Sequence, residues 1–114
     1  MKTVDIKDAP VDSAKIVKCA GEIDAHTCGQ MEKAFAEVLA AGVKYIIVDL
    51  SGVTYMASRG LGMFLNARKQ LDERSGNLIL VAPNGVVEST IGVLGFDSIF
   101  TIVASEDEAV EAAK

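Results

Sequence analysis

The chain has 114 residues, half of them hydrophobic, which suffices for one compact domain spanning residues 1–114. Sixteen acidic residues against eleven basic ones leave a net charge of −5 and an isoelectric point near 4.7, which argues against binding to nucleic acid or an anionic membrane. The apolar runs are too short to insert into a bilayer, the first ten residues carry no secretory signal, and two cysteines without CxxC spacing form no disulfide framework. We therefore expect a small cytoplasmic protein.

Short β-branched runs alternate with stretches of helical periodicity, a pattern typical of βαβ units. In chain order we expect strands at 2–7 and 15–20, a helix at 27–41, a strand at 45–50, a helix at 58–74, a strand at 78–82, a helix at 86–94, a strand at 99–103 and a terminal helix after Ser105. This order predicts an α/β fold with a mostly parallel sheet of about five strands and about four helices, joined by right-handed crossovers. The first strand should be antiparallel to the second, because their link is too short for a crossover.

Three helix ends carry recognisable capping signals. Thr27 with Gln30 three residues later fits a capping box, and Gly42 fits a helix stop. Ser105 is expected to cap the terminal helix, with Glu108 in the reciprocal position.

The segment DLSGVTYMASRGLGMFL, residues 49–65, is the most informative part of the chain. We expect the buried strand to end at Leu50, a turn to pass Ser51 and Gly52, and a helix to begin at Ser58.

Ser58 has two interpretations. As the N-cap of the helix it would have only a structural role, since serine is common there. Alternatively, it lies where unpaired N–H groups and the helix dipole favour an anion, so that a phosphate on Ser58 would be accommodated, with Arg59 adjacent to neutralise it. Gly60 and Gly62 follow in the first turn, where helix propensity would not place them, and suggest tight packing or the close approach of another surface.

Apolar residues around Ser58 are expected mostly in the core. We expect one or two members of the group Met56, Leu61, Met63 and Phe64 to protrude beside Ser58.

Asp24 follows the second strand, and we expect it near Ser58 because the carboxyl ends of neighbouring parallel strands meet at one edge of the sheet. It is either a carboxylate that recognises a partner or a turn residue.

Two other kinds of site, a hydrolase site and a zinc site, fit the sequence less well. A serine hydrolase would have to pair Ser58 with His26, the single histidine, but the sequence lacks the first glycine of a G-x-S-x-G elbow. Cys19, Asp24, His26 and Cys28 lie within ten residues, yet their spacing matches no zinc pattern, and Cys19 alternates into the core.

Three blocks, in order, resemble the STAS domain of the anti-sigma factor antagonist family. They are GEID at 21–24 followed by Thr27, VDLS through YMASRGLG at 48–62, and LGF through IF at 94–100 followed by Ser105 and Glu108. The similarity covers nearly the whole chain, and the combination of the three blocks is specific.

The resemblance implies a switch protein without catalytic activity and without a cofactor. Such domains bind an anti-sigma factor that is also a serine kinase; phosphorylation of the serine aligned with Ser58 breaks the complex, and a serine phosphatase restores it. The residues that the resemblance assigns to the partner-binding surface are Asp24, Thr27, Met56, Ala57, Arg59, Gly60, Leu61 and Gly62.

Two positions beside Ser58 depart from the family pattern: Ala57 stands where aspartate is usual, and Arg59 where serine or threonine is usual. They keep a second hypothesis open, a non-phosphorylated STAS scaffold such as an accessory subunit of a lipid-transport ABC system or of a stressosome-like assembly.

Overall fold

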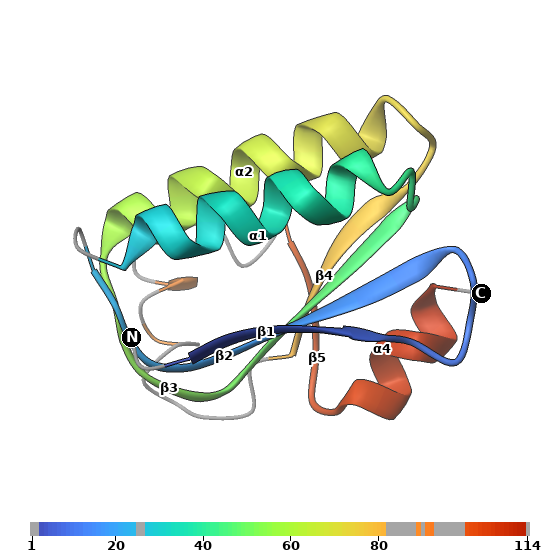
Figure 1. Ribbon diagram of the computed structural model, residues 1–114. Helices are drawn as coiled ribbons and strands as arrows, with labels where there is room; N and C mark the ends of the chain where they lie inside the picture. Colours follow the sequence, from blue (N-terminus) through green and yellow to red (C-terminus); the bar gives the residue numbers. More distant parts are fainter. Residues whose placement is uncertain (1–2, 25–26, 82–88, 90, 93–99, 114) are drawn as a thin grey trace.

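Five strands form one sheet among the residues that the computed structural model describes, namely 3–24, 27–81, 89, 91–92 and 100–113 (Figure 1). In their order across the sheet they are β1 Thr3–Asp8, β2 Ala14–Ile23, β3 Tyr45–Met56, β4 Asn77–Val81 and β5 Thr101–Val103. β1 is antiparallel to β2, and all other neighbouring pairs are parallel. The predicted α/β fold is confirmed, including the antiparallel first strand.

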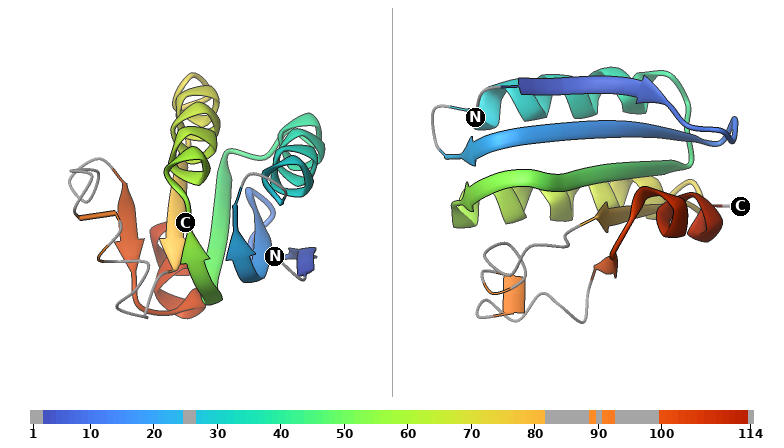
Figure 2. Two further views of the ribbon diagram at one scale, coloured as in Figure 1. Left: turned by 90° about the vertical axis from the view of Figure 1, so that its left-hand side faces the viewer. Right: turned by 90° about the horizontal axis from the view of Figure 1, so that it is seen from below.

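The helices cover the two faces of this sheet unequally. The described helices are α1 Cys28–Ala40, α2 Ser58–Asp72 and α4 Glu106–Ala112. α1 and α2 run side by side over one face, and α4 covers part of the other (Figures 1 and 2). The helix predicted at residues 86–94 falls almost wholly outside the described residues.

β3 is longer than the sequence suggests. It continues past the predicted end at Leu50 to Met56, so the predicted turn at Ser51 and Gly52 is wrong. The extension is paired with β2 through two irregularities in register, and Gly52 lies opposite Ala20. A Cβ on Gly52 would lie only 3.2 Å from the Cβ of Ala20, so the glycine marks a close approach of two strands rather than a turn.

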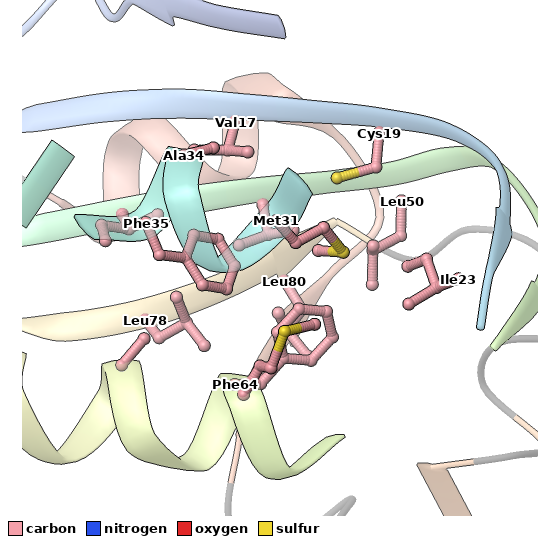
Figure 3. Packing of buried hydrophobic residues seen from close by; sticks show 14 of the residues in the cluster. Val17, Cys19, Ile23, Met31, Ala34, Phe35, Leu50, Phe64, Leu78 and Leu80 are labelled. Atoms are coloured by element: carbon pink, nitrogen blue, oxygen red, sulfur yellow. The ribbon is translucent and has the colours of Figure 1, made fainter. Parts of the chain in front are cut away.

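The main core lies between the sheet and the pair α1 and α2 (Figure 3). Phe64 of α2 is its largest fully buried side chain and packs against Phe35 of α1 and Phe100, with ring centroids 5.9 and 6.2 Å away. A smaller cluster, which includes Ile47 and Ala109, fills the space under α4. α1 and α2 are thus held on the sheet along their buried faces.

The far end of α1 is closed by two residues. Gly42 has φ of +83° and its N–H donates to the carbonyl of Leu39 at 3.1 Å, as predicted for a helix stop. Arg74, which follows α2, donates from Nη1 to the carbonyls of Leu39 and Val43 at 2.9 and 3.1 Å. This guanidinium ties the last turn of α1 to the end of α2.

Candidate functional site

The carboxyl ends of β2 and β3 bring two segments of the chain together. Ile23 is paired with Met56, and the N–H of Ala57 donates to the carbonyl of Ile23 at 2.8 Å. Asp24 and Ser58 each follow directly after this junction, so the structure places them on the same edge of the sheet.

Ser58 is the first residue of α2 and is exposed. The N-cap is Ala57, with φ −78° and ψ 157°, so the interpretation of Ser58 as the N-cap was wrong by one residue. Alanine has no side chain that could accept a hydrogen bond from the first turn, and that turn contains no acidic residue. Since the first N–H groups of a helix have no carbonyl partner within it, the start of α2 is electropositive and lacks a side-chain cap.

Thr27 closes the loop that carries Asp24. The backbone N–H of Asp24 donates to Oγ1 of Thr27 at 2.9 Å, while the N–H of Thr27 donates to Oδ1 of Asp24 at 3.1 Å. The Thr27 hydroxyl also donates to the carbonyl of Glu22 at 3.0 Å. The predicted capping box with Gln30 is wrong, because Thr27 is the N-cap of α1 by position but its side chain bonds backward to the loop instead of forward to the helix.

Arg59 extends from α2 toward α1. Its Nη2 lies 3.9 Å from Oε1 of Glu32, and both side chains are more than half exposed, so the ion pair contributes at most about 1 kcal/mol. Cys28 lies close to both: burial raises the pKa of its thiol above the ordinary value, Arg59 acts to lower the pKa, and Glu32 and Asp24 add to the increase. The thiol therefore stays protonated at neutral pH.

The thiol of Cys19 is likewise protonated at neutral pH. Burial, with a further contribution from Asp49, raises the pKa of Cys19 to about 12. Within residues 3–24, 27–81 and the other described positions, no three side chains of the metal-binding types lie together. His26, on which the hydrolase alternative depends, lies outside the described residues.

The two glycines of α2 differ in what surrounds them. A Cβ on Gly60 would lie 3.0 Å from Cγ2 of Ile23 and 3.3 Å from Cγ of Met56, so close packing requires the glycine there. Gly62 is exposed, and nothing in the described structure lies within 4 Å of a Cβ added to it.

The exposed apolar side chain near the end of β3 is one that the sequence analysis missed. Met56, Leu61, Met63 and Phe64 are all buried, so the expectation that one or two of them protrude was wrong. Tyr55 is instead 52% exposed, and among the described residues it is the exposed large hydrophobic side chain. It lies near the end of β3, opposite Glu22 of β2. The sequence signal that could have predicted this exposure is a tyrosine directly before a buried methionine near the end of a strand.

The chain as a whole is similar to known proteins. A family model described as the STAS domain matches residues 5–109. The chain belongs to the STAS domain family. The anti-sigma-B factor antagonist of Listeria monocytogenes is 31% identical to this STAS domain over 106 residues, covering 93% of this chain and 92% of that protein.

Solved structures agree with this assignment. The crystal structure of an anti-sigma factor antagonist from Mycobacterium paratuberculosis superposes with a TM-score of 0.87 at 28% identity, covering 97% of this STAS domain and 92% of that chain. The phosphorylated form of the Bacillus cell fate determinant SpoIIAA shares the fold, with a TM-score of 0.74 at 20% identity over 98% of this chain and all of that one.

The anti-sigma factor antagonists among these relatives are non-enzymatic regulators. None of the helices in the described part of this STAS domain is long and apolar enough to cross a membrane.

Proposed function

We propose that this STAS domain is a cytoplasmic anti-sigma factor antagonist that binds an anti-sigma factor with serine kinase activity and is released when Ser58 is phosphorylated. A serine phosphatase would return it to the binding form. The observation that carries the proposal is the exposed position of Ser58 at the uncapped start of α2, beside the loop of Asp24.

The proposed partner-binding surface, termed here the Ser58 surface, has an exposed part and a support. Asp24, Ala57 and Thr27 are partly exposed, while Tyr55, Ser58, Arg59 and Gly62 are exposed. Met56, Gly60 and Leu61 are buried and contribute by fixing the start of α2 on the ends of β2 and β3.

Phosphorylation would change the charge at the centre of this surface. The phosphate adds about −1.5 to −2 charges next to a bound partner. Arg59 and the first N–H groups of α2 would stabilise this charge in the free protein, so the phosphorylated form is favoured unbound. A mispaired charge at a buried interface costs about 2–5 kcal/mol, which lowers affinity roughly 30- to 5,000-fold. The occurrence of a phosphorylated form of SpoIIAA on the same fold supports this interpretation.

The test compares Ser58→Ala and Ser58→Asp with the wild type in calorimetric titrations against the purified kinase-type anti-sigma factor of the host. We expect the wild type and Ser58→Ala to bind and Ser58→Asp to lose at least 30-fold in affinity. Intact-mass analysis after incubation with the kinase and ATP should show one added phosphate on the wild type and none on Ser58→Ala. Equal affinity of all three proteins, without phosphorylation, would favour the STAS scaffold instead.

A further inference from the structure

β1 is an edge strand of the sheet, and among the described residues it is paired with β2 alone. It is drawn in dark blue at one edge of the sheet in the right-hand view of Figure 2. All six of its residues are paired with β2 in one unbroken register, and none of them is proline. A regular edge strand presents a row of outward N–H and C=O groups, which can pair with a further strand.

The edge formed by β1 is partly apolar. Val4 and Ile6 are half-buried and pack against the main core from the face of the sheet that α1 covers. Together with Lys33 and Ala34 of α1, they line a hollow of about 250 Å³. The apolar atoms that remain exposed here would be removed from water if a further strand paired with β1, which favours such pairing.

The opposite face of β1 carries two charges of opposite sign. Asp5 and Lys7 alternate with the two apolar residues, and both are exposed. Lys7 donates from Nζ to Oε1 of Glu106 at 3.1 Å, and an ammonium group has three donors, so it can also bind a second carboxylate. A lone lysine on an edge strand opposes pairing with another strand, but here an aspartate lies two residues away on the same face.

This charge pattern is complementary to itself in one register. Two copies of β1 that pair antiparallel about a twofold axis must place one residue opposite itself, because opposed side chains lie on the same face of a sheet. With Ile6 opposite Ile6 of the second copy, Asp5 faces Lys7 in both directions and two opposite-charge pairs form. Registers centred on Asp5 or Lys7 place like charges directly opposite each other, and a register centred on Val4 leaves Lys7 outside the paired segment.

We propose that two copies of this chain pair antiparallel through β1, centred on Ile6, and so join their sheets into one. At the ends of the paired segment Val4 faces Asp8, whose carboxylate is already neutralised by Lys15 at 2.6 Å. β2 separates β1 from β3, so this contact does not involve the start of α2. The inference is therefore independent of the proposed function.

The expected dimer is weak. A single pair of six-residue strands buries less than the roughly 1,200 Å² of stable complexes, so the dimer should form in the upper micromolar range and dissociate on dilution. Sedimentation velocity of the full chain from about 10 μM to about 1 mM measures this equilibrium.

Two charge reversals test the register. Asp5→Lys gives each β1 two lysines and Lys7→Glu gives each β1 two acidic residues, so each variant alone should stay monomeric at the highest concentration. An equimolar mixture of the two variants restores both opposite-charge pairs and should dimerise as the wild type does. Asp72→Lys and Lys69→Glu make the same charge changes at exposed positions of α2 and should dimerise normally.

The melting temperature of every variant is measured in parallel. Lys7→Glu also removes the exposed ion pair with Glu106, whereas Asp5→Lys leaves that pair intact and gives the same test by itself. A dimer that Asp5→Lys and Asp72→Lys leave equally intact, or a mixture of the two β1 variants that stays monomeric, would overturn the proposal. A wild type that is monomeric at the highest concentration would also overturn it and would leave the edge of β1 to a strand of another protein.

Discussion

The starts of α2 and α4 differ in whether side chains cap the unpaired N–H groups of the first turn. At α4, Oγ of Ser105 accepts a hydrogen bond from the N–H of Glu108 at 3.2 Å, and Oε2 of Glu108 accepts one from the N–H of Ala104 at 2.9 Å. The predicted role of Ser105 is confirmed, and three acidic residues in the first turn complement the helix dipole. At α2 the N-cap is alanine, no acidic residue lies in the first turn, and Arg59 adds positive charge to a positive helix end.

We interpret this difference as a division of roles, in which the start of α4 stabilises the fold and the start of α2 binds a partner. The short helix α4 has a side-chain cap and three acidic residues in its first turn, as expected for an element that stabilises one face of the sheet. The start of α2 lacks these features and is supported by the packing of Gly60 against Ile23 instead. An uncapped and electropositive helix start beside an exposed serine is a feature that we expect to be retained for binding. Changes at α2 should therefore act on the partner, and changes at α4 on folding.

Among substitutions outside Ser58, the largest effect is expected from Tyr55→Ala. Removing the exposed aromatic ring near the end of β3 should lower affinity for the anti-sigma factor by about 10- to 100-fold, because aromatic residues dominate the energetics of interfaces. The free energy of unfolding should change by less than about 0.5 kcal/mol, since the ring is half exposed. Tyr55→Phe, which keeps the ring, is the control in the same titration; a loss of stability without a loss of affinity would contradict the assignment of Tyr55 to the Ser58 surface.

Ser105→Ala should show the opposite behaviour. Loss of the cap is expected to lower the free energy of unfolding by about 1 kcal/mol, measured by denaturant titration, and to leave partner affinity unchanged. Ser58→Ala is the matched control, because Ser58 is not an N-cap and its replacement should cost little stability. Equal destabilisation by both variants would contradict the distinction between the two helix starts.

Ala57→Asp tests whether the missing side-chain cap of α2 affects stability and the phosphorylation of Ser58. A carboxylate at the N-cap should accept hydrogen bonds from the first turn and raise the free energy of unfolding by about 0.5–1 kcal/mol. The same carboxylate would oppose a phosphate on Ser58 and reduce the preference of that phosphate for the helix start. Ala57→Asn, a neutral cap, separates the two effects in parallel unfolding and phosphorylation measurements. An unstable Ala57→Asp variant would show that the start of α2 is closed to a cap.

The smallest effect is expected in the pH dependence of stability, at Glu106, the first residue of α4. A hydrogen bond with Asp49 and partial burial raise the pKa of Glu106, against a smaller opposing effect of Lys7, which donates to it at 3.1 Å. The folded state thus holds this proton more tightly than the unfolded chain, so the contribution of Glu106 to stability is complete at acid pH and is lost as the pH rises through its raised pKa. We expect the difference in unfolding free energy between the wild type and Glu106→Gln to decrease as the pH rises from about 4 toward neutrality.

Asp49 is expected to respond in the opposite direction. Burial acts to raise its pKa, but hydrogen bonds involving Glu106 and Ser51, with the charge of Lys18, outweigh burial and lower the pKa. The contribution of Asp49 to the free energy of unfolding is therefore present at neutral pH. It is lost as the pH falls below the ordinary pKa of an aspartate and through the lowered pKa of Asp49. A difference between the wild type and Glu106→Gln that stays constant with pH would contradict the coupling of the two carboxyl groups.

Most elements could be predicted from local patterns. The apolar run at the start of β3, the helical period of α1 and α2 and the signals at Gly42 and Ser105 each depend on residues close in the chain, and the structure agrees with them. The errors have a common origin. Thr27 prefers the loop of Asp24 over the first turn of α1, and Gly52 is part of a strand because β2 lies against it. In each case a competing partner decides the outcome, and local propensity cannot identify that partner.

The amino-acid order alone determined the α/β architecture, the buried faces of its helices and the position of Ser58 close to a helix start, because periodicity and capping act over a few residues. The folded chain decided that Ala57 is the N-cap, that Tyr55 is exposed while its apolar neighbours are buried, and that α1 and α2 leave a groove beside Gly62. These features depend on how β2 pairs with β3 and how two helices far apart in the chain lie on one sheet. Contacts of that kind arise only when the whole domain is packed.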